Sequence, residues 1–137
     1  MDKKYQIILN RVIDGDSFEV DIVLGFGIIL QNKHIRLNGI DTPELRTSDD
    51  EEKKYGLLAK SYVLHWCGGD RDLFLVIKNP SNEYDKFGRI LGDLEDAQGN
   101  SLVDDLIKNF HGVAYKGQSK SEIKKAHLAN RIKLKTI

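Results

Sequence analysis

Hydrophobic and polar residues alternate along the first part of the chain in the manner of β-strands. The run Lys4 to Arg11 is rich in β-forming residues, and from Phe18 to Leu24 every second residue is apolar, as in a strand with one buried face. Two further apolar stretches follow at 28–30 and 34–37, after a glycine-containing turn at 25–27. We therefore predict a hairpin and then a third strand in this region.

The middle of the chain predicts one helix. Residues 45–54 are polar and are expected to form a surface loop. Beyond them, apolar side chains recur at intervals of three and four residues, the period of an amphipathic helix, and Gly68-Gly69 ends the pattern. The apolar positions are Tyr55, Leu58, Ala59, Tyr62, Val63 and Trp66.

The second half of the chain predicts two more strands and two more helices. Strands are expected at 73–78 and 89–94, separated by a turn or loop at 79–82. Serine residues precede both helical patterns and can cap them. The candidate caps are Ser101 for the first helix and Ser119 or Ser121 for the last.

The order of these elements predicts the fold class. Three strands, a helix, two strands and terminal helices define an α+β protein. Five short strands with a helix after the third match a five-stranded OB-fold β-barrel, here with about three helices. No repeat, low-complexity tract or linker interrupts the chain, so residues 1–137 are expected to form a single domain.

The composition is that of a globular protein without a membrane span. Hydrophobic residues make up 40% and charged residues 31% of the chain, and no apolar run approaches the length that crosses a bilayer. The single Cys67 excludes an intrachain disulfide and is expected to be a buried, inert thiol. Nothing in the sequence indicates an obligate protein partner, so we expect a monomer.

The N-terminal segment predicts a location inside the cell. It reads MDKKYQIIL and lacks the apolar stretch and cleavage site of a signal peptide. A cytoplasmic protein is therefore expected, with a secreted form whose leader has been removed as the alternative.

The net charge of zero hides an uneven distribution. Residues 1–100 carry a net charge of −5 and residues 101–137 a net charge of +5, with most of the basic excess between Lys120 and Lys135. This basic segment is either a patch that faces phosphate or a solvated helix face, and the second interpretation is the simpler one.

Two acidic motifs could hold a hard cation. The turn at 14–16 has a simple interpretation as a connection between strands, because Asp-Gly tolerates positive φ. Asp41 lies just before Thr42-Pro43, where the backbone is held extended. If Asp16 and Asp41 meet, their carboxylates, a backbone carbonyl and water would form an open calcium site. The four histidines show no spacing typical of zinc ligands.

A third acid and two arginines would suit phosphodiester chemistry. Glu44 lies three residues beyond Asp41 and could take a proton from an attacking water, or it could be a surface glutamate. Arg36 and Arg89 could each donate two hydrogen bonds to a phosphate and stabilise the charge of a transition state. The alternative for Arg36 is a charged partner on the solvent face of the sheet, and residues 85–89 could simply be a turn and the start of a strand.

The order and the residues of four motifs resemble those of the staphylococcal nuclease (thermonuclease) family. The motifs are Ile13-Asp14-Gly15-Asp16-Ser17, Ile35-Arg36-Leu37, Ile40-Asp41-Thr42-Pro43-Glu44 and Tyr84-Asp85-Lys86-Phe87-Gly88-Arg89. The resemblance is good from Tyr5 to about Leu94 and looser beyond. It implies an OB-fold barrel with three helices and a calcium-dependent phosphodiesterase. Such an enzyme would hydrolyse single-stranded DNA, with RNA as a second candidate substrate, by in-line attack of water, leaving 3′-phosphate ends.

The resemblance also implies a role for each matching residue. The expected calcium ligands are Asp16, Asp41 and the carbonyl of Thr42. The expected catalytic residues are Glu44, which activates water, and Arg36 and Arg89, which bind the phosphate. The expected contacts to a terminal phosphate of the substrate are Lys86 and Tyr115, and the expected supporting residues near the ion are Asp14 and Ser17.

Four departures from the family pattern concern the binding of substrate. Phe87 stands where the best-known members have tyrosine, and Lys116-Gly117 follow Tyr115 where a second tyrosine would be expected. Asp49 to Glu52 is acidic where basic members have lysines, and the chain is neutral overall. Because an acidic surface repels a polyanion, we expect the chemistry to be retained and the affinity for nucleic acid to be reduced or redirected.

Two other interpretations stay open beside the nuclease. The chain could be a catalytically weak or inactive OB-fold module that binds nucleic acid or protein, although degenerate modules of this kind usually lose the acids or arginines that are present here. It could also be a structural domain, against which four ordered motifs argue. A nuclease kept inside its producing cell would suit a phage or mobile-element origin.

Overall fold

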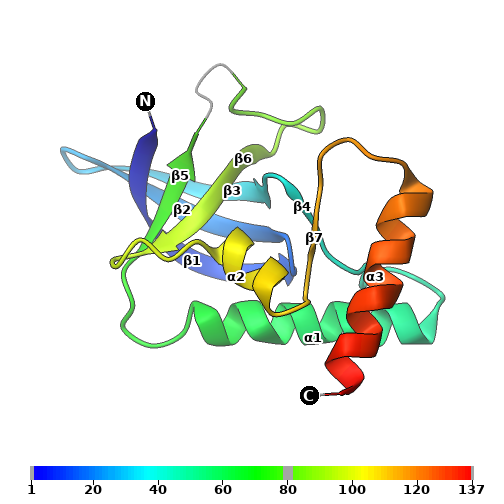
Figure 1. The fold of residues 1–137 in the computed structure, drawn as a ribbon. Helices are drawn as coiled ribbons and strands as arrows, with labels where there is room; N and C mark the ends of the chain where they lie inside the picture. Colours follow the sequence, from blue (N-terminus) through cyan, green and yellow to red (C-terminus); the bar gives the residue numbers. More distant parts are fainter. Residues whose placement is uncertain (1, 79–81, 137) are drawn as a thin grey trace.

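A closed five-stranded β-barrel forms the centre of the protein in the computed structural model, which describes residues 2–78 and 82–136 (Figure 1). Neighbouring strands follow the order β1-β2-β3-β6-β5, and all are antiparallel except β3 and β6, whose parallel pairing closes the barrel. The strands are β1 (Lys3–Asp14), β2 (Ser17–Gly25), β3 (Ile28–Leu37), β5 (Leu73–Ile77) and β6 (Ile90–Asp96). The predicted α+β barrel is confirmed. Of the loop predicted at 79–82, residues 79–81 lie outside the described residues.

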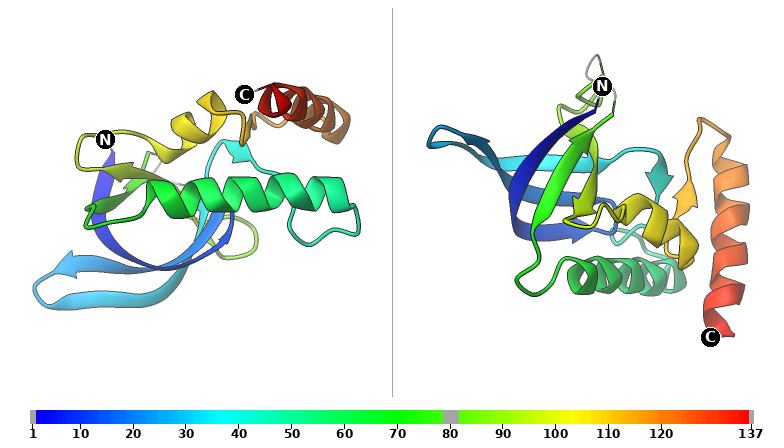
Figure 2. Two further views of the ribbon diagram at one scale, coloured as in Figure 1. Left: turned by 90° about the horizontal axis from the view of Figure 1, so that it is seen from below. Right: turned by 60° about the vertical axis from the view of Figure 1, so that its left-hand side comes forward.

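Strand β3 is longer than the sequence pattern indicates. The two apolar stretches predicted as separate pieces form one strand, which pairs with β2 in a hairpin that projects from the barrel (Figure 2). The polar residues between them include a bulge opposite Asp21, where Asn32 has a φ of +56° and donates its backbone N–H to the Asp21 carboxylate at 2.9 Å. The bulge and solvent exposure explain why the alternation is lost there.

Alternate residues of the strands fill the barrel with apolar side chains. Phe18 and Val20 of β2 and Ile35 and Leu37 of β3 are fully buried, as the alternation predicts. Leu94 of β6 completes this layer. The register that buries these side chains places the polar residues between them, Arg36 included, on the outer side of the barrel wall.

Helix α1 (Asp50–Trp66) begins earlier than predicted, and the expectation of a surface loop over 45–54 is wrong for its last part. Asp49 caps the helix by accepting hydrogen bonds from two backbone N–H groups, and acidic side chains occupy the first turn, where the helix dipole favours negative charge. The helix packs on the barrel through a buried face of Tyr55, Gly56, Ala59, Val63 and Trp66. Leu58, predicted on that face, is 40% exposed.

Two further helices and a small strand pair follow. Helix α2 (Leu102–Lys108) and helix α3 (Lys120–Lys135) are capped by Ser101 and Ser119, two of the predicted caps. Strands β4 (Ile40–Asp41) and β7 (Val113–Ala114) pair between the barrel and α3 (Figure 1). These two-residue strands have no pattern in the sequence.

Helix α3 differs from the other two in its packing. None of its described residues is buried, whereas α1 and α2 both insert apolar side chains into the core. None of the helices among residues 2–78 and 82–136 is long and apolar enough to cross a membrane. Cys67, at the end of α1, is buried as expected, and burial raises the pKa of its thiol to about 12.

Replacement of Gly56 by alanine tests how closely α1 packs against the backbone of residues 43–44. A Cβ at this position would lie 2.8 Å from the Glu44 carbonyl oxygen and 3.0 Å from that of Pro43. Alanine favours a helix over glycine by about 1 kcal/mol, but here the collision is with backbone. We therefore expect Gly56→Ala to lower the free energy of unfolding by about 1–3 kcal/mol. Urea denaturation followed by Trp66 fluorescence checks this, and Ser61→Ala, at an exposed site on the same helix, should be neutral or slightly stabilising.

Candidate active site

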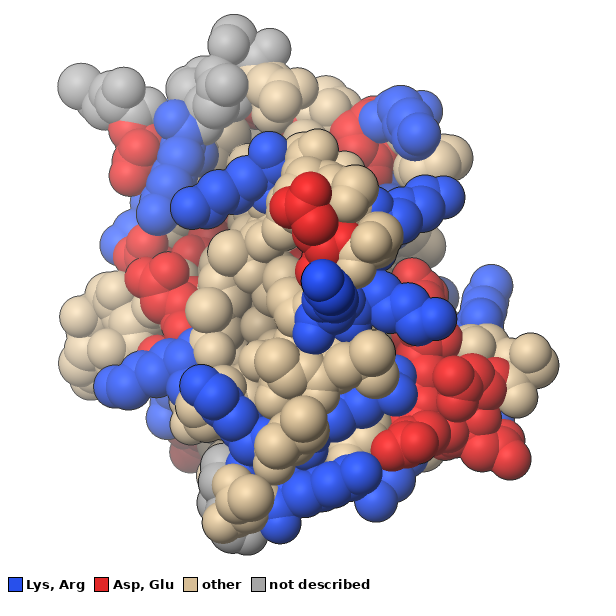
Figure 3. Space-filling view, turned by 45° about the vertical axis from the view of Figure 1, so that its right-hand side comes forward, with Lys and Arg blue, Asp and Glu red and all other residues tan. Residues whose placement is uncertain are grey.

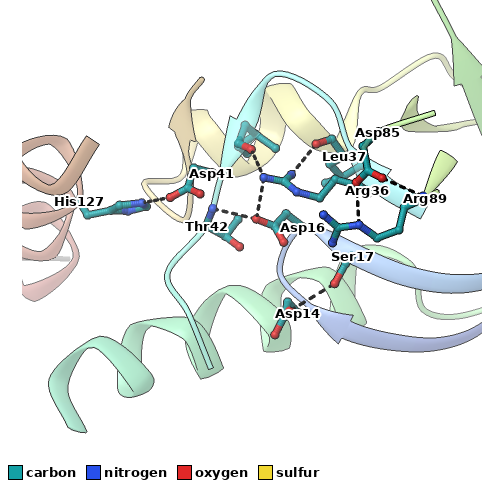
Figure 4. A network of polar contacts seen from close by, with 11 residues as sticks. Asp14, Asp16, Ser17, Arg36, Leu37, Asp41, Thr42, Asp85, Arg89 and His127 are labelled. Atoms are coloured by element: carbon teal, nitrogen blue, oxygen red, sulfur yellow. Dashed lines mark hydrogen bonds and ion pairs between the residues drawn. The ribbon is translucent and has the colours of Figure 1, made fainter. Parts of the chain in front are cut away.

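The turn between β1 and β2 lies against α1 and the segment after β4. Ser17 donates its hydroxyl hydrogen to the Asp14 carboxylate at 3.3 Å (Figure 4). A Cβ on Gly15 would come within 2.9 Å of Ala59 and 3.0 Å of the Thr42 hydroxyl. Gly15 does not have a positive φ, so the predicted reason for a glycine here is wrong. The glycine is required because the turn is in close contact with its neighbours.

Asp16 links this turn to the segment that contains Asp41. Its Oδ2 accepts a hydrogen bond from the Thr42 backbone N–H at 3.1 Å and lies 3.5 Å from an Arg36 Nη (Figure 4). Burial raises the pKa of Asp16 above its ordinary value, although Arg36 and the Thr42 amide oppose this shift and favour the carboxylate.

Arg36 is held by backbone carbonyls as well as by Asp16. One guanidinium nitrogen donates to Leu37 O at 2.5 Å and the other to Ile40 O at 3.0 Å, and the side chain is only 17% exposed. An arginine that served as a partner on the barrel surface would be more exposed. The contacts fix the plane of the guanidinium and leave its other N–H groups available.

Arg89 is oriented by its own loop. Its Nε donates to Asp85 Oδ2 at 2.7 Å and its backbone N–H to Asp85 Oδ1 at 2.8 Å, and the Phe87 N–H also donates to Oδ1 at 2.9 Å. Burial alone would raise the pKa of Asp85, but these hydrogen bonds and the Arg89 charge hold it below its ordinary value. Sequence analysis treated Asp85 as part of a turn and missed this function, which the i, i+4 spacing to Arg89 could have indicated.

Barrel closure brings the two arginines to one cavity. Ile35 pairs with Ile90, so Arg36 and Arg89 lie beside the β3–β6 junction. The cavity has a volume of about 370 Å³. Its lining includes Arg36, Lys86, Phe87, Arg89 and Tyr115, so the structure brings together both predicted arginines and both predicted substrate contacts. Tyr115 reaches this position because its backbone N–H donates to Gly39 O at 2.8 Å.

The predicted acids gather next to this cavity. Desolvation raises the pKa of Glu44, and the charges of Asp16, Asp14 and Asp41 raise it further, although the Glu44 residue is exposed overall. Mutual repulsion of this kind requires that the carboxylates lie close together. The hydrogen bond from the Thr42 amide to Asp16 joins the first and third motifs directly, so their acids lie on the same side of the site (Figure 4).

The oxygen atoms of this group suit a hard cation. Among the described residues, one carboxylate oxygen each of Asp16 and Asp41 has no hydrogen-bond partner. No group of three or more His, Cys, Asp or Glu side chains within residues 2–78 and 82–136 is arranged to hold a metal ion by itself. A cation here would need backbone carbonyl and water ligands as well, which is the open site that the sequence predicts.

His127 is a member of the site that sequence analysis missed. Its Nε2 lies 2.7 Å from Asp41 Oδ2, and the imidazole is 13% exposed (Figure 4). The two residues are 86 positions apart, on α3 and β4. No periodic pattern or motif in the sequence connects them, so only the fold shows the contact.

Comparison with known proteins identifies the class of the domain. A family model for staphylococcal nuclease homologues matches residues 34–133. The chain belongs to the staphylococcal nuclease family. The match includes the segment beyond Leu94, where the resemblance was expected to be looser.

Among curated proteins, the chain is similar to endonuclease YhcR of Bacillus subtilis (strain 168). The two are 26% identical in an alignment 118 residues long, which covers 82% of this chain. The matched region makes up 9% of the length of YhcR. The similarity therefore concerns a domain and not the whole of that protein.

Replacement of His127 by alanine tests how α3 is held. The helix has no buried residue, so loss of the bond to Asp41 should cost about 1 kcal/mol of its docking. We expect His127→Ala to increase amide hydrogen exchange throughout 120–135 while the barrel strands keep their protection, as measured by mass spectrometry. Lys125→Ala, on the same helix, is the matched control and should change neither. Unaltered exchange in α3 would show that other contacts hold the helix.

Proposed function

We propose that the protein is a calcium-dependent phosphodiesterase that hydrolyses single-stranded DNA, with RNA as a second candidate substrate, leaving 3′-phosphate ends. The observation that supports this most is the arrangement of Arg36 and Arg89 around one cavity, with a group of four carboxylates beside it. Fixed guanidinium groups next to acids provide both the phosphate grip and the base that phosphodiester hydrolysis requires. The single domain, monomeric state and cytoplasmic location stay predictions.

In this proposal Asp16, Asp41 and the Thr42 carbonyl hold a calcium ion, which neutralises phosphate charge when it is bound. Asp14 and Ser17 support the turn from which Asp16 projects. Burial raises the pKa of Asp16, and the Thr42 amide and Arg36, which both contact it, act in the opposite direction and favour its ionised form. His127 takes one oxygen of Asp41 and leaves the other for the ion.

Glu44 is the proposed general base. Desolvation and the neighbouring carboxylates raise its pKa, which makes its carboxylate a better proton acceptor than an ordinary glutamate. It accepts a proton from the water that attacks phosphorus, and the bond to the 5′ oxygen breaks. Because Gly56 has no side chain, α1 packs directly against the backbone of Glu44 and so holds that backbone in position.

Arg36 and Arg89 bind the phosphate and stabilise the added charge of the transition state. Their partners are already in place, with backbone carbonyls and Asp16 on the first and Asp85 on the second. The guanidinium groups therefore need little reorganisation as the reaction proceeds. Lys86 and Tyr115, in the same cavity, contact a terminal phosphate of the substrate.

Cleavage of single-stranded DNA in millimolar calcium tests this function. We expect Arg36→Ala and Arg89→Ala each to lower kcat by about 100-fold or more, and Glu44→Gln or a chelator to abolish cleavage. Arg36→Lys and Arg89→Lys should restore little, because lysine lacks the planar fork. Arg11→Ala removes an exposed arginine elsewhere and should act like wild type, and circular dichroism confirms that each variant is folded.

Near-normal cleavage by either alanine variant would contradict these roles. Substrate that stays intact under all conditions but binds the protein in fluorescence anisotropy would favour the OB-fold binding module. End-group analysis of the products shows which P–O bond is cleaved. A 3′-phosphate is expected if the bond to the 5′ oxygen breaks.

Asp85→Asn tests the positioning of Arg89 separately from its charge. Asparagine can still accept the loop N–H bonds but no longer carries the charge that holds Nε, so we expect kcat/KM to fall about tenfold, less than for Arg89→Ala. Asp96→Asn is a close control. Asp96 accepts the same pattern of N–H bonds, from Gln98 and Asn100, in a loop away from the cavity. Equal activity of the two asparagine variants would contradict a positioning role for Asp85.

A further inference from the structure

A second cavity lies on the other side of Asp41. It has a volume of about 530 Å³, larger than the first, and is lined by residues of α3 and of the N-terminal end of α1. Tyr115 lines both cavities, and Asp41 and His127 line the second. A nucleic acid chain that does not end in a phosphate at Lys86 and Tyr115 can therefore continue past Tyr115 into this second cavity.

The α3 side of the second cavity is basic. Lys120, Lys124 and Arg131 line it, and among the described residues Lys120 and Lys124 make no ion pair. The Nε of Arg131 is buried without a hydrogen-bond partner there, while its guanidinium lies over the Tyr55 ring at 5.3 Å. Figure 3 shows the Lys and Arg side chains gathered on this face.

Apolar and aromatic surface separates these cations. Ile123 and Leu128 line the same cavity, with Leu128 43% exposed, and Tyr115 at the junction is 45% exposed. Exposed rings and aliphatic side chains between basic groups are the surface on which the bases of a single strand stack while its phosphates are bound.

The opposite wall is acidic. Asp49 and Glu52 of the α1 N-terminal region line it, and Figure 3 shows a dense acidic group at the edge of the basic face. A polyanion would be repelled by this wall and attracted by the other. Its phosphates therefore have one favourable side, and the acidic wall reduces the affinity without closing the cavity.

We propose that this second cavity binds the continuation of a single-stranded nucleic acid chain whose scissile phosphate lies at Arg36 and Arg89, with its phosphates toward Lys120 and Lys124 of α3. The proposal rests on the proposed function for the position of the first phosphate. It assigns a role to the basic segment 120–135, for which sequence analysis preferred a solvated helix face. The two cavities together form a track, and the second one contributes only to substrates long enough to reach it.

Substrate length separates this proposal from the proposed function. We would measure kcat/KM in calcium on a 5′-phosphorylated dithymidylate and on an oligothymidylate of about ten nucleotides. At low salt, Lys124→Glu should lower kcat/KM for the long substrate by about tenfold. It should leave kcat/KM for the short substrate within about twofold of the wild-type value. Lys125→Glu is the matched control: it is adjacent, exposed, on the same helix and equal in charge change, but outside the cavity lining. It should affect the long substrate by less than about threefold.

Binding in the presence of a chelator gives a second measurement that needs no cleavage. In fluorescence anisotropy with the labelled oligothymidylate, Lys124→Glu should weaken binding and Glu52→Gln should strengthen it. If the oligonucleotide lies between the basic and the acidic wall, these two substitutions should change its affinity in opposite directions.

The outcomes distinguish the two hypotheses. Equal effects of Lys124→Glu and Lys125→Glu on the long substrate, or an equal loss on both substrates, would overturn the second cavity as a binding track and leave the proposed function intact. Absence of cleavage by the wild type, with the same wall-dependent binding in chelator, would overturn the proposed function and support the track.

Discussion

The contact on which the site most depends is the hydrogen bond from the Thr42 amide to Asp16. It joins the turn between the first two strands to the segment that follows β4, two pieces of chain that share no β-ladder. Arg36 adds a third piece through the same carboxylate oxygen. A small-side-chain interface, with Gly15 against Ala59 and Thr42, allows the pieces to come this close. The geometry of the acids follows from this junction.

The junction brings several carboxylates together, and nearby donors partly offset their repulsion. Desolvation and the charges of four neighbouring carboxylates raise the pKa of Glu44, while Arg36 and the Thr42 amide favour ionisation of the buried Asp16. Two like charges at a few ångströms cost free energy at any reasonable dielectric constant. A site of this kind is a place where stability is exchanged for reactivity, which is common for functional sites in proteins.

Much of the fold could be predicted from the sequence, because side-chain alternation and helical periodicity report burial directly. Phe18 and Ile35 lie in the barrel interior where the alternation placed them, and Ser119 caps the last helix. The start of α1 was missed because Asp49 and the acids after it resemble a polar loop, although they are a favourable cap and first turn. Of the motif residues, Arg36 and Arg89 line one cavity in the fold, and Asp16 lies beside Arg36, while their roles stay predictions. The contact of His127 with Asp41 and the second cavity depend on how α3 docks, and no local pattern encodes that.

The parallel pairing of β3 with β6 has a consequence for folding. It joins residues 35–37 to residues 90–92, across more than fifty residues of chain, whereas β1, β2 and β3 pair through short connections. Pairs that close a long loop lose more chain entropy and tend to form after the local ones. Arg36 and Arg89 sit on the two sides of that late seam. A chain that has formed its hairpins but not closed its barrel therefore has Arg36 close to the turn that carries Asp16 but lacks Arg89 beside it, so the two arginines of the proposed phosphate site come together only when the barrel closes.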